Sequence, residues 1–144
     1  MTQGLDQNRV ALLLAMLEKR GGMQLTGDDV FVNIAGGMTV DEPASDLAVL
    51  GAIASSVRNR PIAATTAVFG EVGLAGEVRA VARADARLKE AAKLGFGSAI
   101  VPPRRGTGAV AGPRLIEIGH VADLLALLRA PPAAAAGERR TGHA

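Results

Sequence analysis

Hydrophobic residues recur every three or four positions in several stretches of this chain, the spacing that places them on one face of an α-helix. Polar or glycine-rich turns bound each stretch, and Gly21-Gly22 and Gly95 follow two of them as helix C-terminal signals. Asp6 is a candidate N-cap for the first helix, as Asp41 or Glu42 is for the second. The pattern predicts helices at Asp6–Arg20, Pro43–Arg58, Ala82–Leu94 and Val121–Arg129.

Short apolar runs between these helices predict β-strands. The turn Thr26-Gly27-Asp28 joins the first two strands into a hairpin, and Gly73-Leu74-Ala75-Gly76 joins the third and fourth. Helices mixed with strands in this order indicate the α/β (α+β) class, with a mixed sheet and flanking helices. The predicted strands are Met23–Leu25, Asp29–Gly36, Thr66–Val72, Glu77–Val81, Ser98–Val101 and Leu115–Ile118.

The length of 144 residues indicates one domain. We expect this domain to occupy residues 1–130. From there the chain reads Pro-Pro, an alanine run and Gly-Glu-Arg-Arg, with little to pack into a core. Residues 131–144 are therefore predicted to be a disordered tail.

Composition excludes several kinds of chemistry. The chain has no cysteine and two widely separated histidines, so disulfides and cysteine metal sites are excluded and no metal site is expected. No apolar run approaches the roughly 18 residues of a membrane span, and no signal peptide is evident. We therefore expect a cytoplasmic protein without membrane contact.

Charge is unevenly distributed along the chain. Residues 1–57 hold three basic and seven acidic side chains, whereas residues 58–114 hold ten basic and four acidic ones. Two interpretations remain open: a solvated face paired with Glu71, Glu77, Asp85 and Glu90, or contacts with the phosphates of a nucleic acid. Few aromatic residues are present to stack on bases. The candidate phosphate-binding residues are Arg58, Arg60, Arg79, Arg83, Arg87, Arg104 and Arg105.

Three motifs together resemble the proteolytic domain of the Lon protease family. They are Gly36–Asp46, Phe69–Arg79, and Leu88–Phe96 followed by Ala99–Pro102. The order and spacing are most similar to the Lon-like C-terminal domain of the RadA (Sms) family of bacterial DNA repair proteins. The resemblance extends from about Leu5 to Leu128 and implies the Lon proteolytic-domain fold.

The resemblance also locates the catalytic positions of Lon proteases, a serine nucleophile in Asp-Gly-Pro-Ser-Ala-Gly and a lysine base. On this chain they fall on Ala44 and Asp85, so the resemblance implies a domain without peptidase activity. Ser45 is a poor substitute because one helical residue turns its side chain by about 100°. An aspartate, whose ordinary pKa is about 4, is a poor base. The alternative is a divergent Lon-type serine peptidase.

For partners, the resemblance implies DNA and self-assembly into a homo-hexamer. The family acts in recombination and branch migration as a DNA-dependent ATPase. This chain contains no phosphate-binding Gly-x-x-x-x-Gly-Lys-Ser/Thr loop and no cysteine pair. We therefore expect no cofactor in this domain, with ATP, magnesium and zinc bound by other segments of a parent protein.

Overall fold

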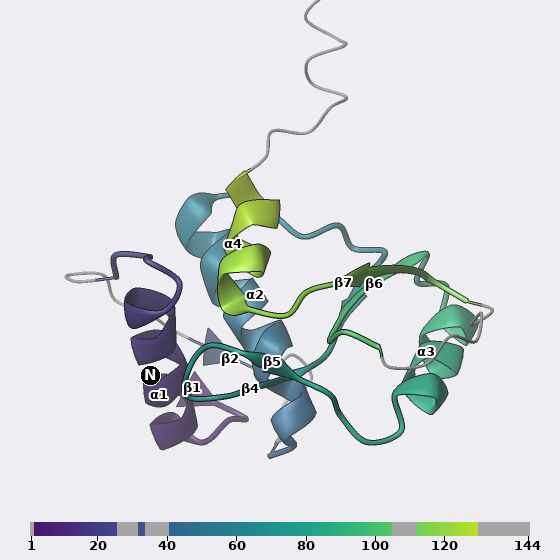
Figure 1. Cartoon of the computed structure of the whole chain (residues 1–144), viewed down its shortest axis with the longest axis horizontal. Helices are drawn as coiled ribbons and strands as arrows, with labels where there is room; N and C mark the ends of the chain where they lie inside the picture. Colours follow the sequence, from purple (N-terminus) through teal and green to yellow (C-terminus); the bar gives the residue numbers. More distant parts are fainter. Residues whose placement is uncertain (1, 26–31, 34–40, 105–111, 130–144) are drawn as a thin grey trace, which may run out of the picture.

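The computed structural model describes residues 2–25, 32–33, 41–104 and 112–129 (Figure 1). Helices alternate with short strands, and a 3-10 turn (η2) leads directly into the second helix. The elements are β1 Thr2–Gln3, α1 Gln7–Lys19, β2 Val32–Asn33, η2 Pro43–Ser45, α2 Asp46–Arg58, β3 Thr66–Val68, β4 Glu71–Val72, β5 Val78–Arg79, α3 Ala84–Lys93, β6 Ser98–Val101, β7 Arg114–Glu117 and α4 Val121–Arg129. The mixed α/β class predicted from the sequence is confirmed.

The central sheet has three parallel strands in the order β3-β6-β7. Because side chains alternate between the faces of a strand, each aligned row of this sheet faces one side. One row, Val68-Ile100-Ile116, joins the larger core, which is formed with α1, α2 and α4. The row on the opposite face, Ala67-Ala99-Leu115, joins a smaller core with α3.

Helix α2 forms the centre of the larger core. It contacts α1 on one side and α4 on another, and it also packs on β3 (Figure 1). Leu47 and Leu50 on α2 and Leu124 on α4 are completely buried. The domain is thus layered, with α3 on one face of the sheet and the other helices on the opposite face.

All four predicted helices are present, with changes at their starts. Asp6 caps α1 as predicted, because its carboxylate accepts a hydrogen bond from the Asn8 amide at 3.0 Å. Glu42 occupies the N-cap position of η2, near the start of the second helix as predicted, but its side chain makes no capping hydrogen bond. Helix α3 begins at Ala84 instead of Ala82, because Arg83 has a left-handed conformation with φ 59°.

The strand predictions need two corrections. Met23–Leu25 is not a strand; Met23 and Leu25 are buried in the larger core, and the Met23 amide instead donates to Leu17 O at the end of α1. The predicted strand Thr66–Val72 is divided into β3 and β4, which belong to different sheets. The division falls at Gly70, whose amide donates to Ala44 O at 2.8 Å while its carbonyl accepts from the Leu47 amide at 3.0 Å.

The second predicted hairpin is confirmed, since β4 and β5 pair antiparallel across the glycine turn. Strand β1 was not predicted; it pairs in parallel with β2, which lies inside the predicted strand Asp29–Gly36. The rest of that strand, the turn Thr26–Asp28 and the tail 131–144 lie outside the described residues.

His120 joins this hairpin to the start of α4. Its Nδ1 accepts from the Ala122 amide at 3.0 Å, so the proton lies on Nε2, which donates to Ala75 O at 3.1 Å. We expect His120→Ala to lower the free energy of unfolding by about 1–2 kcal/mol, because it removes the cap and the link to the hairpin. His120→Asn, which retains an N-cap side chain, is the control and is expected to lose less than half of this in urea denaturation. Equal losses in the two variants would contradict the capping role.

Candidate protease-like site and nucleic-acid interface

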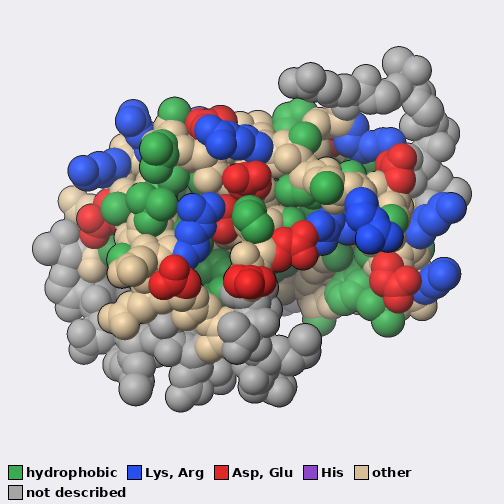
Figure 2. Space-filling view, turned by 90° about the horizontal axis from the view of Figure 1, so that it is seen from below, with side chains coloured by type: hydrophobic (Ala, Val, Ile, Leu, Met, Phe, Trp, Pro, Cys, Tyr) green, Lys and Arg blue, Asp and Glu red, His purple; other side chains and the backbone are tan. Residues whose placement is uncertain are grey.

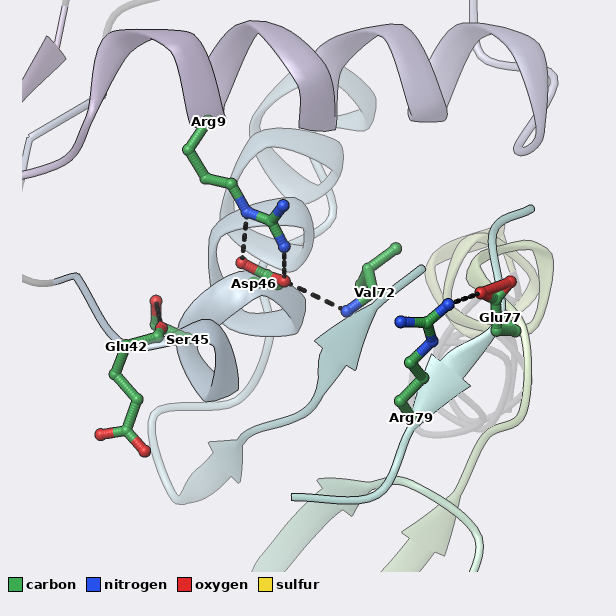
Figure 3. A network of polar contacts seen from close by, with 7 residues as sticks. All are labelled: Arg9, Glu42, Ser45, Asp46, Val72, Glu77 and Arg79. Carbon is green, nitrogen blue, oxygen red and sulfur yellow. Dashed lines mark hydrogen bonds and ion pairs between the residues drawn. The ribbon is translucent and has the colours of Figure 1, made fainter. Parts of the chain in front are cut away.

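Ala44, at the nucleophile position implied by the resemblance, lies in η2 directly before α2. Its side chain is buried, and its carbonyl accepts the hydrogen bond from the Gly70 amide. The neighbouring Ser45 hydroxyl donates to Glu42 O at 2.7 Å, within the same turn (Figure 3). Among the described residues, no side chain that might act as a base hydrogen-bonds to Ser45.

Asp85, at the implied lysine position, lies in the first turn of α3. Its side chain is 75% exposed and accepts a hydrogen bond from Arg104 Nη2 at 3.3 Å. It lines a cavity of about 300 Å³, whereas Ser45 lines a different cavity of about 280 Å³ beside α1. The structure therefore does not bring Ser45 and Asp85 into one cavity.

An ion pair between the buried Asp46 and the partly exposed Arg9 lies next to this turn (Figure 3). Asp46 is 2% exposed, and its Oδ1 accepts from Arg9 Nε at 3.1 Å. Its Oδ2 accepts from Arg9 Nη2 and also from the Val72 amide at 3.2 Å. The hydrogen bond to Asp46 raises the pKa of Arg9, and burial opposes this only in part. The pair fastens α1 and β4 to the start of α2.

Sequence reasoning missed this ion pair. Asp46 resembles an ordinary acidic residue in a first helical turn, and Arg9 resembles a residue on the solvent face of α1. One signal was available, because the carboxylate directly precedes the almost entirely apolar run Leu47–Ala54. A charge beside such a run is close to the core and requires a partner.

Three of the candidate arginines within the described residues form ion pairs. Arg79 pairs with Glu77 at 2.9 Å, and Arg104 pairs with Asp85, as the interpretation of a paired, solvated face predicted. Arg87 instead pairs with Glu42, which was not predicted as a partner, and its Nε also donates to Ala82 O at 3.0 Å.

The Glu77 carboxylate, held over the hairpin turn, has a lowered pKa. The main cause is a hydrogen bond from its own backbone amide, and Arg79 contributes further. Because the folded pKa is lower than the unfolded one, this interaction stabilises the fold above the ordinary value of 4.5. The contribution disappears as the pH falls through the folded pKa.

Arg60 and Arg83 are exposed, and within the described part of the chain neither side chain has an ion-pair partner. Arg83 lies at the N-cap position of α3, and Arg87 lies within the helix. Both line one shallow depression together with Glu42 and Glu90. Arg58 is half-buried at the end of α2, and its Nε has no partner in the described structure. Arg105 lies outside the described residues.

The charged surface is mixed. Figure 2 shows Lys and Arg side chains separated by Asp and Glu side chains over much of one face. Cations gather more closely toward the end of the molecule that carries α3, whose exposed residues include Lys89 and Lys93. On the face shown, the exposed carboxylates of Asp85 and Glu90 belong to the same helix, so this end is basic but not uniformly so.

Metal and membrane sites were searched over the same parts of the chain. The described residues contain no group of three or more His, Cys, Asp or Glu side chains placed to hold a metal ion. None of the described helices combines the length and the apolar character needed to cross a bilayer.

Comparison with known proteins identifies the relatives of this chain. No family model matches it. The DNA repair protein RadA of Haemophilus influenzae is 49% identical over 126 residues, covering 87% of this chain and 28% of the relative. RadA of Pseudomonas aeruginosa is 57% identical over 102 residues, which cover 71% of this chain and 22% of the relative. RadA of Bacillus subtilis is 48% identical over 129 residues, which cover 90% of this chain and 28% of the relative.

These similarities identify the chain as a mixed α/β domain from a family of bacterial DNA repair proteins. The family is RadA, and the chain belongs to it. The chain spans about a quarter of the length of these relatives, as the 22% and 28% coverages show, which is consistent with a C-terminal domain. The resemblance to RadA stated from the sequence is thereby confirmed.

Proposed function

We propose that this chain is the non-proteolytic Lon-like domain of a RadA-type DNA repair and recombination ATPase. It contributes DNA contacts and assembly into a homo-hexameric ring during branch migration and other processing of recombination intermediates. The observation that carries the proposal is the 48% identity to a DNA repair protein over 90% of the chain. ATP hydrolysis belongs to segments of the parent protein outside this chain, which acts in the cytoplasm.

The arrangement around α2 supports a domain without peptidase activity. Ala44 has no nucleophilic atom, and the Ser45 hydroxyl is occupied by the carbonyl of Glu42. Activation of a serine requires a base within hydrogen-bond reach, and Asp85 lines a different cavity from Ser45. The divergent peptidase is therefore not favoured.

Support for DNA contact comes from the arginines. Arg60 and Arg83 are exposed and have no ion-pair partner among the described residues, so they can take phosphate oxygens as partners. Arg79, Arg87 and Arg104 would have to exchange a carboxylate for a phosphate. Guanidinium groups bind phosphates in a bidentate manner, and such contacts do not depend on the base sequence.

The test is fluorescence anisotropy of labelled single- and double-stranded DNA over a salt series. We expect Arg60→Gln/Arg83→Gln to weaken binding. The slope of the logarithm of the duplex-binding constant against the logarithm of the salt concentration should become shallower by roughly 0.9 for each phosphate that is no longer bound. The control, Lys19→Gln/Arg20→Gln, removes the same charge from α1 and should leave the slope unchanged. Absence of binding at low salt, or an equal reduction in the control, would overturn the DNA contact.

A further inference from the structure

A shallow depression of about 570 Å³ lies where the residue before η2 meets the first turns of α3. Two arginines and two glutamates provide its charged lining, and two alanines lie among them. The arginines are one helical turn apart, since the Arg87 amide donates to Arg83 O at 3.0 Å. We call this site the η2–α3 depression; its lining residues are Glu42, Ala82, Arg83, Ala86, Arg87 and Glu90.

The Arg87 guanidinium group is held in place from within its own segment. Its Nε donates to Ala82 O at 3.0 Å, which fixes the group beside the start of α3. Its Nη2 donates to the Glu42 carboxylate. The side chain is 30% exposed, so a ligand can reach it from solvent. An anion that displaced Glu42 would therefore meet a donor that is already positioned, which lowers the entropic cost of binding.

The Glu42 carboxylate can leave this pair without disturbing the rest of the fold. It makes no capping hydrogen bond, and its side chain is 53% exposed. Figure 3 shows it directed away from the neighbouring pair of Arg9 and Asp46. An ion pair this exposed contributes little to stability, because water and salt screen the two charges. Exchange of the carboxylate for another anion is therefore inexpensive.

Arg83 supplies a second cation to the same depression. It is exposed at the N-cap position of α3, and it has no ion-pair partner in the described part of the chain. Together with Arg87 it can offer two guanidinium groups to one phosphate, whose oxygens accept from such groups in a bidentate manner. With Glu42 in place, however, two carboxylates balance the two arginines. The Glu42 carboxylate thus occupies a position that suits a phosphate.

We propose that the η2–α3 depression binds one phosphate of the DNA backbone through Arg83 and Arg87, and that Glu42 competes with this phosphate for Arg87. This inference rests on the DNA contact in the proposed function and adds the place of one contact and an internal competitor. Each phosphate bound here must first displace a carboxylate of the domain itself. The competition therefore makes DNA binding weaker than the two arginines alone would allow.

Fluorescence anisotropy of labelled duplex DNA at low salt measures this competition. Glu42→Gln removes the charge and is expected to tighten binding about fivefold, the factor that corresponds to one exposed ion pair that no longer has to be broken. Asp41→Asn removes the same charge from an exposed neighbour outside the depression. Glu90→Gln removes it inside the depression, from a side chain without an ion-pair partner among the described residues. Both controls should change the affinity by less than about twofold.

A double-mutant cycle separates competition for Arg87 from simple repulsion of DNA by Glu42. In an Arg87→Gln background, Glu42→Gln should change the affinity by less than about twofold, because no guanidinium group remains to be released. Circular dichroism of each variant verifies that it is folded. A gain that persists without Arg87, or one that either control also gives, overturns the competition.

The same measurements distinguish failure of this inference from failure of the proposed function. DNA binding by the unmodified chain with no gain in Glu42→Gln would overturn the competition and leave the DNA contact standing. Absence of binding by both proteins at low salt would overturn the DNA contact and the inference together. Arg83→Gln should weaken binding with or without Glu42→Gln, and an unchanged affinity would overturn the proposed two-arginine site.

Discussion

Replacing Asp46 with alanine is expected to lower the free energy of unfolding by about 2–3 kcal/mol, because the buried Val72 amide loses its acceptor while the Arg9 side chain, which is 36% exposed, can still be hydrated. The Arg9 guanidinium is then left without its carboxylate, and the buried Val72 amide is left without its acceptor. Because Asp46 is 2% exposed, water does not readily replace the missing carboxylate. The loss of stability combines an unpaired cation with an unpaired amide.

Urea denaturation of matched variants measures this effect. Asp41→Ala removes an exposed carboxylate a few residues earlier and is expected to change stability by less than about 0.5 kcal/mol. Arg9→Met keeps the bond from the Val72 amide to Asp46 but leaves the buried carboxylate without its cation, so it measures the cost of that unpaired charge. A loss below about 1 kcal/mol for Asp46→Ala would show that the network does not hold α1 and β4 to α2.

The sequence predicted the parts of this domain that depend on local periodicity. Helix α1 and its Asp6 cap, the β4–β5 hairpin and the C-terminal signal at Gly95 follow from spacing and turn residues. Each of these features is determined by residues close together in the chain, which is the condition under which patterns predict structure well.

Features that depend on long-range contacts were not predictable in this way. The division of Thr66–Val72 arises because the backbone of Gly70 bonds to both Ala44 and Leu47 at the start of α2. Likewise, the short strand β1 exists only because β2 lies beside it. No periodic pattern marks either event, since the partner is distant in sequence in both cases.

Among the candidate phosphate-binding residues, too, pairing between sequence neighbours was predictable and pairing across the fold was not. Sequence identified the basic stretch and, by proximity, the pairing of Arg79 with Glu77. It did not reveal that Arg87 pairs with Glu42, 45 residues away, and therefore did not distinguish occupied from free cations. This distinction decides which substitutions test DNA binding without first disturbing an ion pair.

Replacing Leu50 with alanine is expected to cost about 2–5 kcal/mol, because Leu50 is completely buried at the centre of the larger core. Its helix α2 packs on α1, α4 and β3 at once, so no single neighbour can move to fill the space without giving up packing elsewhere. Leu94→Ala deletes the same atoms from a side chain that is 68% exposed and should change stability by less than about 0.5 kcal/mol. Thermal and urea unfolding of the two variants compare the sites directly. Similar small losses of stability at both positions would mean that α2 is not the common packing surface of these elements.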